Sequence, residues 1–331
     1  MSNNKKHLII IHGRATKPSE TEKKRLVKLS LLHGLNRVDT EAADMLKNSN
    51  IKYTFVYYGD ISNREILRKD PGKKSDLKGK NDANHDLAPC ELAGSYDDDL
   101  AEMFEYDTFT KKAYKNFLKA VRDKRGLDEA ASIVSGIASL IGLSDTVIRK
   151  ATPDMGAYLM TRKVGSEIRE RLQAHLKKAL LDNEDICLVS HSMGCIVSYD
   201  VLWKFSQMSE YRDIQNSNNK VNLWLTLGNP LGEPGVIDNL YDSNELEDGK
   251  YPKNIINRWM NISARDDFVA HDEAVADDFK AMKERKYVNE IKDITNIYNF
   301  WAGRDGSNPH KFYGYLDNPT VAKQIAQWIL K

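Results

Sequence analysis

The stretch Ile186-Cys-Leu-Val-Ser-His-Ser-Met-Gly-Cys195 decides the fold, because its apolar first half predicts a buried strand that turns sharply into a helix. The helix is predicted to run from Met193 to Phe205. Ser192 then lies in a strained turn with positive φ, and the residues two positions away must be small. They are Ser190 and Gly194, whereas the usual nucleophile elbow has glycine at both places. The alternative is an ordinary strand followed by a helix with a serine N-cap.

Candidate acids and bases follow two later strands of the predicted sheet. After the elbow helix and a strand at 221–227, the run 255–262 leads to Asp266 and Asp267, and the run 294–301 leads to His310. In an α/β-hydrolase the partners of the serine come in the order Asp or Glu, then His, each on a loop after a later strand. The order along this chain is the same.

Asp267 is our predicted acid, because Asp267-Phe-Val resembles the Asp-x-Val turn that follows the acid-bearing strand in many hydrolases. Asp266 is its near competitor, and a solvated acidic turn is the alternative for both. Only His271 and His310 lie downstream of the acid. We predict His310 as the base, since it lies on a loop of Gly, Asn and Pro after the last strand, whereas His271 falls on a predicted helix. His191 is predicted to be a packing residue.

Two backbone amides are predicted to form an oxyanion hole. The run Leu8 to Ile11 suits a central parallel strand buried on both faces, and it ends in His12-Gly13. We assign one donor to the amide of Arg14, just past that pair, and the other to the amide of Met193 at the start of the elbow helix. Otherwise Gly13 is only a loop residue.

Taken together, these motifs resemble the α/β-hydrolase superfamily, and in particular bacterial lipase-like serine esterases. The chain is similar to uncharacterised hydrolases grouped with the inositol deacylases that act on glycosylphosphatidylinositol anchors. The likeness is carried in order along the chain by residues 11–14, 189–194, 225–231, 266–269, 309–310 and Tyr313. It implies a mostly parallel central sheet with helices on both faces. Ser190 in place of glycine departs from the family pattern.

Composition is compatible with one large α/β domain over residues 1–331 and excludes several classes of partner. With 49 basic and 48 acidic residues, the net charge of +1 does not favour nucleic acid or an anionic surface. No apolar run reaches the length of a membrane span. Three cysteines, an odd number, fit a reducing compartment, so we expect a cytoplasmic protein. We also expect no cofactor and no metal, because the calcium-like run Asp82 to Asp86 lacks the glycine and the glutamate that such a loop needs.

A helical and loop insertion is predicted at about residues 59–155, above the carboxyl ends of the strands, where a lid would lie. Its first part, Gly59 to about Pro89, is polar and predicts a long exposed loop. Within it, Ala130 to Leu143 fits a buried packing helix, a mobile gating helix or a membrane-interface contact. The sequence leaves these three open, and it does not predict the oligomeric state.

The predicted function is hydrolysis of a small-molecule or lipid-like carboxylic ester through an acyl-enzyme. Ser192 would be the nucleophile, His310 the base, and Asp267 the acid that orients it. A thioesterase or amidase would use the same residues. A noncatalytic scaffold that binds a partner is the alternative from a different class.

Overall fold

The core of the protein is a parallel β-sheet. The computed structural model describes residues 4–15, 17–73, 153–264, 267, 269, 274–299, 301–303, 306–307 and 309–331. Within these ranges the sheet has six strands in the order β2-β1-β3-β4-β5-β6, and every neighbouring pair is parallel. The strands are β1 (Lys6–Ile11), β2 (Lys52–Val56), β3 (Asp185–His191), β4 (Val221–Leu227), β5 (Ile256–Ala264) and β6 (Glu290–Ile297). A separate antiparallel ribbon pairs β7 (Ala302–Gly303) with β8 (Gly306–Ser307).

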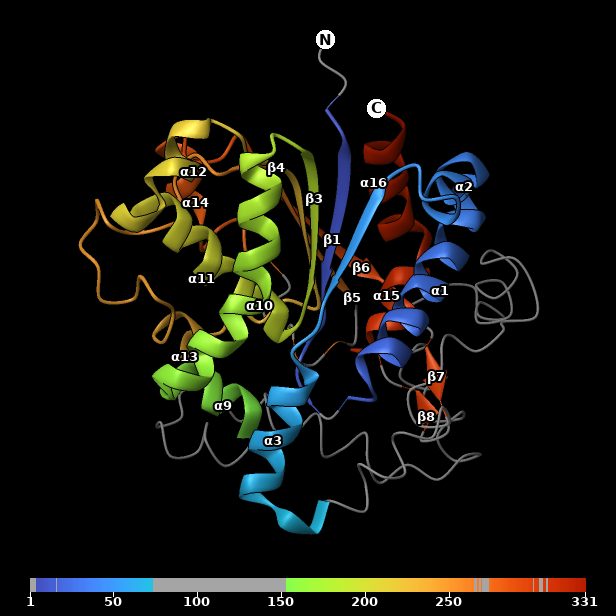
Figure 1. Ribbon diagram of the computed structural model, residues 1–331, viewed down its shortest axis with the longest axis horizontal. Coiled ribbons are helices and arrows are strands. Elements are labelled where there is room, and N and C mark those ends of the chain that lie inside the picture. Colours follow the sequence, from blue (N-terminus) through green and yellow to red (C-terminus); the bar gives the residue numbers. More distant parts are fainter. Residues whose placement is uncertain are drawn as a thin grey trace.

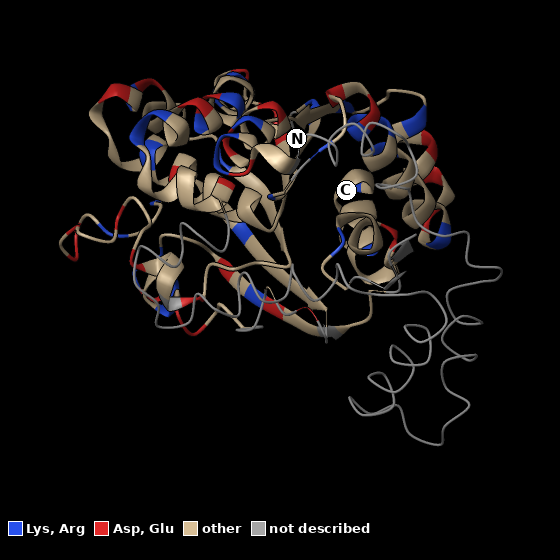
Figure 2. Ribbon diagram, turned by 90° about the horizontal axis from the view of Figure 1, so that it is seen from below, with Lys and Arg blue, Asp and Glu red and all other residues tan. Residues whose placement is uncertain are grey.

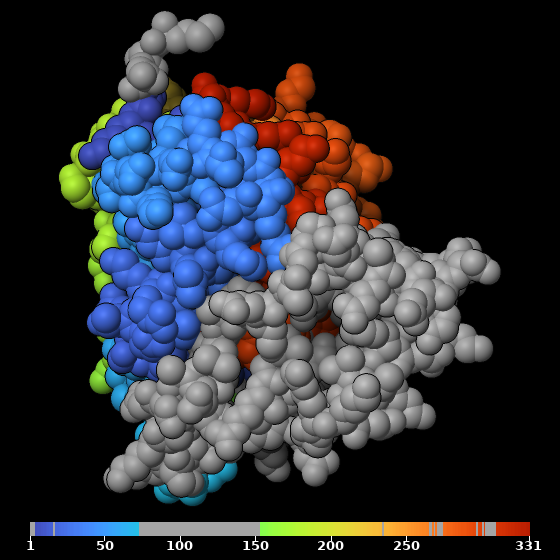
Figure 3. All heavy atoms as spheres, turned by 90° about the vertical axis from the view of Figure 1, so that its right-hand side faces the viewer, coloured from blue at the N-terminus to red at the C-terminus, as the bar shows by residue number. Residues whose placement is uncertain are grey.

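Helices cover both faces of the sheet (Figure 1), which confirms the predicted α/β class. One layer contains α3 (Gly59–Lys69), α9 (Pro153–Met160), α10 (Arg162–Leu181), α11 (Met193–Gln207), α12 (Arg212–Ser217), α13 (Pro234–Ile237) and α14 (Lys280–Glu284). The opposite layer contains α1 (Glu20–Val38), α2 (Thr40–Lys47), α15 (Phe312–Asp317) and α16 (Pro319–Leu330). Short 3-10 turns occupy Pro71–Lys73 and Ser209–Tyr211. Figure 3 shows the outer surface of the second layer, where α1 and α2 in blue adjoin α16 in red.

Strand β1 explains why both layers are needed. Its side chains alternate between the two faces, so Leu8 and Ile10 pack with α1 and α16, while Ile9 and Ile11 pack with α10 and α11. All four are fully buried, and burial of each such side chain contributes roughly 1.5–3 kcal/mol. Charged residues lie mainly on the outer faces of the helices (Figure 2). At the sheet edge, β6 carries Glu290, Lys292 and Asp293, and such charges discourage pairing with another strand.

The sheet grows from β1 to β2 on one side and from β3 to β6 on the other, so the strand order changes direction between β1 and β3. The chain leaves β1 toward α1 on one face and leaves β3 toward α11 on the other. In open parallel sheets, ligands bind beyond the carboxyl ends of the strands at such a point. The segments after these two strands are His12 to Ala15 and the turn at Ser192.

Three sequence predictions about element bounds are wrong. Residues 59–69 form helix α3 rather than an exposed loop, and the side chains of Ile61 and Ile66 are buried in the core. The capping-box pattern Ser19 to Glu22 predicts a helix that ends at about His33 with Gly34 as its stop, but helix α1 continues to Val38. A Cβ on Gly34 would lie 2.2 Å from the carbonyl oxygen of Leu316, so this glycine allows α1 to approach α15. Strand β6 begins four residues earlier than the predicted 294 and ends at Ile297.

Most of the predicted insertion lies outside the described residues. This holds for residues 74–152, and so for Asp82 to Asp86, Cys90 and the apolar run 130–143. In the described ranges, none of the helices combines the length and the apolar character that crossing a membrane requires. The same ranges contain no group of three or more His, Cys, Asp or Glu side chains placed to hold a metal ion.

Candidate active site

The turn between β3 and α11 holds Ser192 in a strained conformation. Its backbone has φ 54° and ψ −129°, which a non-glycine residue adopts only when its surroundings enforce it. The amide of Ser192 donates to the carbonyl of Leu227 at 3.0 Å, and the amide of Cys195 donates to the carbonyl of Ser192 at 2.8 Å. These bonds fix the turn, and α11 begins directly at Met193.

Small neighbours make room for this turn. A Cβ on Gly194 would lie 2.6 Å from the carbonyl oxygen of His12, so the start of α11 passes close to the end of β1. Ser190 stands where the family pattern has glycine, and its hydroxyl lies 2.7 Å from that of Ser198 and accepts from the indole of Trp224 at 3.0 Å. The departure is accommodated because the extra hydroxyl is buried with partners of its own.

Ser192, His310 and Asp267 form a continuous hydrogen-bonded chain. The Nε2 atom of His310 lies 2.9 Å from Oγ of Ser192. Its Nδ1 atom lies 2.8 Å from each carboxylate oxygen of Asp267. The Asp267 side chain is 0 % exposed, and that of His310 is 12 % exposed. With Nδ1 donating to the carboxylate, Nε2 is free to accept the hydroxyl proton of Ser192.

The carboxylate of Asp267 is held by the turn that follows β5. The Asp267 amide donates to the carbonyl of Ala264 at 3.0 Å, and the Val269 amide donates to Oδ1 at 2.9 Å. The hydroxyl of Tyr315 donates to Oδ2 at 2.6 Å. The competing candidates Asp266 and His271 lie outside the described residues.

Gly228, just after β4, lies against this pair. It has φ +53°, and a Cβ there would lie 2.6 Å from Oδ2 of Asp267 and 3.0 Å from Nδ1 of His310. Only glycine therefore fits without displacing the histidine or the carboxylate. Sequence reasoning missed Gly228 and Tyr315 as site residues. The Gly-Asn-Pro run after a predicted strand could have drawn attention to Gly228, but no spacing points to Tyr315.

His191 packs behind the base, as predicted, and also contacts it. Its ring stacks on Phe312 with centroids 4.6 Å apart, and its Nε2 lies 2.8 Å from the carbonyl oxygen of His310. Burial, followed by the proximity of His310, lowers the pKa of His191 well below its ordinary value. His191 is therefore neutral at pH 7, and its Nε2–H donates to that carbonyl.

The segment after β1 brings the second predicted amide next to the nucleophile. A Cβ on Gly13 would lie 2.6 Å from Cβ of Ser192, so the backbone passes directly beside the serine. The Tyr58 amide donates to Nε2 of His12 at 3.1 Å, and therefore the Nδ1–H of His12 donates to the carbonyl of Gly13 at 2.7 Å. That carbonyl shares a peptide plane with the Arg14 amide, so His12 fixes the direction of the predicted donor.

Asp154 anchors the same segment from α9. Its Oδ2 accepts from the Ala15 amide at 2.6 Å, and Ala15 has φ 75°. Its Oδ1 lies 4.0 Å from Nε of Arg14. Burial lowers the pKa of the Arg14 guanidinium, and the charge of Asp154 opposes that shift. Of the predicted residues, the structure thus places Ser192, His310 and Asp267 in mutual contact, and Met193 and Arg14 in the segments beside Ser192.

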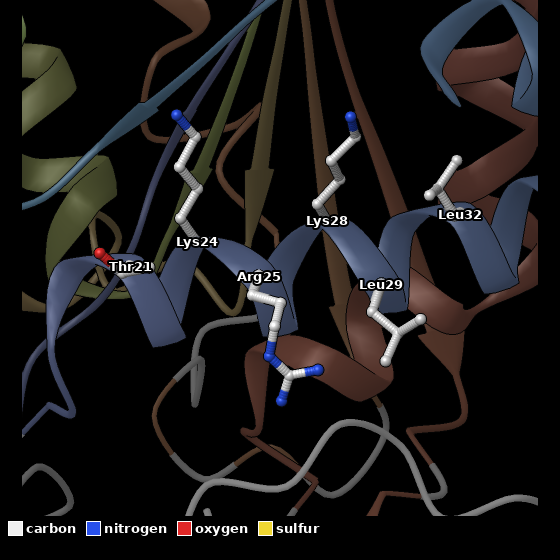
Figure 4. A pocket seen from close by; sticks show the side chains of 6 residues that line it. All are labelled: Thr21, Lys24, Arg25, Lys28, Leu29 and Leu32. Carbon is white, nitrogen blue, oxygen red and sulfur yellow. The ribbon is translucent and has the colours of Figure 1, made fainter. Parts of the chain in front are cut away.

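Two pockets bounded by described residues lie away from this site. One, of about 380 Å³, follows the outer face of α1. Figure 4 shows Lys24 and Lys28 pointing to one side of it, and Arg25 and Leu29 to the other. A second lies between α3 and α10, where Arg64 pairs with Glu167 at 2.6 Å. None of their described lining residues belongs to the hydrogen-bonded chain of Ser192, His310 and Asp267.

Comparison with protein-family models, curated protein sequences and solved structures finds no significant match. The resemblance to lipase-like esterases therefore stays a prediction from the sequence.

Proposed function

We propose that the protein is a serine hydrolase that cleaves a carboxylic ester through an acyl-enzyme intermediate. The observation that carries this proposal is the chain from Oγ of Ser192 through both ring nitrogens of His310 to the buried carboxylate of Asp267. A nucleophile bonded to a base, which is in turn oriented by an acid, is the arrangement that activates a serine hydroxyl.

Each proton in the reaction has a defined path. Nε2 of His310 takes the hydroxyl proton as Oγ of Ser192 bonds to the ester carbonyl carbon, and the carboxylate of Asp267 stabilises the resulting imidazolium. The imidazolium then gives the proton to the departing alkoxide, so an alcohol leaves and Ser192 carries the acyl group. Water repeats the sequence: its proton passes to His310, its oxygen attacks the acyl carbon, and Ser192 recovers a proton as the acid leaves.

The negative charge on the carbonyl oxygen needs donors that are already in place. The amide of Met193 lies at the N-terminus of α11, where the helix dipole favours an anion. The amide of Arg14 lies in the segment that Gly13 brings against Ser192 and that His12 and Asp154 hold. We assign the oxyanion hole to these two amides.

The proposed substrate is a small-molecule or lipid-like ester, with thioesters and amides as alternatives that profiling would separate. We also propose a reducing compartment such as the cytoplasm. The described cysteines, Cys187 and Cys195, are both buried free thiols. Burial raises the pKa of each thiol, and such cysteines are inert packing residues.

A fluorophosphonate probe and chromogenic esters test the proposal together. We expect a covalent adduct on Ser192, located by peptide mass spectrometry, and hydrolysis that falls on the order of 10⁶-fold in Ser192→Ala. The matched control is Ser198→Ala, which removes a nearby buried hydroxyl and should keep both properties. Full activity in Ser192→Ala would contradict the assignment. A wild-type protein that is neither labelled nor active on esters, thioesters or amides would favour the noncatalytic scaffold.

A further inference from the structure

Tyr315 makes two hydrogen bonds in the heart of the candidate site. Its hydroxyl donates to Oδ2 of Asp267 at 2.6 Å and accepts from the amide of Ala264 at 2.8 Å. The side chain is fully buried. A phenol in this position joins the end of β5, the acid and helix α15 through a single oxygen atom.

We propose that Tyr315 is a positioning residue that fixes the orientation of the Asp267 carboxylate toward His310, an inference that rests on the proposed function. The carboxylate faces the imidazole symmetrically, with both oxygens 2.8 Å from Nδ1 of His310. That contact alone favours neither oxygen as the acceptor of the Nδ1 proton. The Val269 amide holds Oδ1 and Tyr315 holds Oδ2, so each oxygen has a donor of its own.

The phenol is suited to this role because it stays a donor. Burial, and after it the charge of Asp267, raises the pKa of Tyr315 well above its ordinary value. The hydroxyl therefore keeps its proton at any pH at which the protein would work. The same oxygen accepts a hydrogen bond from the Ala264 amide, and this bond fixes the position of the hydroxyl.

Helix α15 also links Tyr315 to the base. It begins at Phe312, two residues after His310, and the ring of Phe312 stacks on that of His191. His191 in turn bonds the carbonyl of His310. One short segment thus carries the base and the residue that holds the acid, so Tyr315 sets the position of Asp267 relative to His310.

The test compares Tyr315→Phe with Tyr313→Phe in the full chain. Both tyrosines are fully buried on α15, but the hydroxyl of Tyr313 accepts from Nζ of Lys23 at 2.6 Å, away from Asp267. With chromogenic esters we expect Tyr315→Phe to lower kcat about 10-fold with KM within about twofold, as losing one hydrogen bond to a charged group allows. Tyr313→Phe should keep the wild-type kcat, and its thermal stability should fall about as much as that of Tyr315→Phe.

A second measurement does not depend on turnover. We expect the proton between Nδ1 of His310 and the carboxylate of Asp267 to resonate far downfield in the proton NMR spectrum, and His310→Ala to assign this resonance by removing it. We expect this resonance to move or broaden in Tyr315→Phe and to stay in place in Tyr313→Phe. Equal kcat and equal resonance positions in the two variants would overturn the positioning role. A wild-type protein inactive on every substrate would refute the proposed function, while the resonance would still decide the role of Tyr315.

Discussion

Two polar clusters with a buried aspartate each involve helix α11, one at its N-terminus and one at Asp200 in its middle, and they are built from similar parts. The first is the site cluster of Ser192, His310, Asp267 and Tyr315. The second, which we call the Asp200 cluster, consists of Tyr158, Arg169, Asp200 and Tyr241. In both, a buried tyrosine hydroxyl donates to a buried aspartate: Tyr315 to Asp267 at 2.6 Å and Tyr158 to Asp200 at 2.5 Å.

The clusters differ in the group that faces the carboxylate. Asp200 faces the guanidinium of Arg169, with Nη1 3.9 Å from Oδ2, and Arg169 also donates to the hydroxyl of Tyr241 at 2.9 Å. A guanidinium keeps its charge, so Arg169 passes no proton to or from Asp200. Asp267 instead faces an imidazole, whose second ring nitrogen can accept a proton while the first donates to the carboxylate. The same kind of tyrosine–aspartate pair therefore secures helices in one place and would support proton transfer in the other.

Matched aspartate substitutions should give the largest difference in turnover between the two clusters. Asp267→Asn presents an amide to His310 and favours the tautomer with the proton on Nε2, which cannot accept from Ser192. We expect turnover of a chromogenic ester to fall by about 10³–10⁴-fold, as in other serine triads. Asp200→Asn, further along α11 and outside the hydrogen-bonded chain of Ser192, His310 and Asp267, should keep turnover within about twofold. Similar losses in both variants would show that helix packing, not proton transfer, sets the activity.

Gly228→Ala should have the next largest effect. A methyl group would lie 2.6 Å from Oδ2 of Asp267 on a residue with φ +53°, so the acid or the base must move. We expect a loss of kcat on the order of 100-fold, because misplacement by about 1 Å has that effect, and a loss of about 1–2 kcal/mol in the free energy of unfolding. Gly72→Ala is the control, since the nearest atom to its Cβ would be Oδ1 of Asp70 at 3.2 Å. Wild-type kinetics in Gly228→Ala would show that the glycine has no part in holding the acid and the base.

The fold and the core of the candidate site could be predicted because their signals are local. The run Leu8 to Ile11 is apolar on both faces, which indicates a central parallel strand, and the turn at Ser192 has its small neighbours within two residues. The candidates Asp267 and His310 could be chosen because each follows a strand whose pattern is visible. The structure places both within hydrogen-bonding reach of one another.

The missed features depend on contacts between distant segments. Gly34 looked like a helix stop, but it is small because Leu316, nearly 300 positions later, packs against it. Tyr315 gave no signal, since a tyrosine beyond the last predicted strand is ordinarily a packing residue. Helix α3 was hidden because its composition is polar: Ile61 and Ile66 are the only large apolar side chains on its buried face, which also contains Ser62 and Glu65.

Arg169→Met should affect stability and leave the chemistry intact. The substitution leaves the carboxylate of Asp200 buried without a facing cation, and removing one member of a buried ion pair is costly. We expect the free energy of unfolding to fall by about 2 kcal/mol. The loss stays this small because Arg169 lies 3.9 Å away and because Asp200 also accepts from Tyr158 and from the Tyr241 amide. Chemical denaturation measures the free energy of unfolding, and ester hydrolysis should stay at the wild-type rate below the transition. A large loss of kcat would instead couple the Asp200 cluster to the site.

The smallest expected effect is a dependence of stability on pH that comes from Asp200. Burial raises its pKa to about 6, against the opposing effects of Tyr158 and Arg169. A carboxyl with a raised pKa binds its proton more tightly in the folded protein than in the unfolded chain. Its contribution is therefore most favourable below the unfolded value near 4 and is lost as the pH rises through about 6.

Between pH 7 and pH 5, wild type should gain on the order of 1 kcal/mol of unfolding free energy relative to Asp200→Asn. Denaturant titrations of the two proteins at both pH values measure this difference. Taking the difference cancels the groups that titrate alike in the two proteins. If this difference in unfolding free energy does not change with pH, or changes in the opposite direction, Asp200 is already ionised in the folded protein below pH 5. The attraction of Arg169 would then outweigh burial, and the Asp200 cluster would be a fixed ion pair throughout this range.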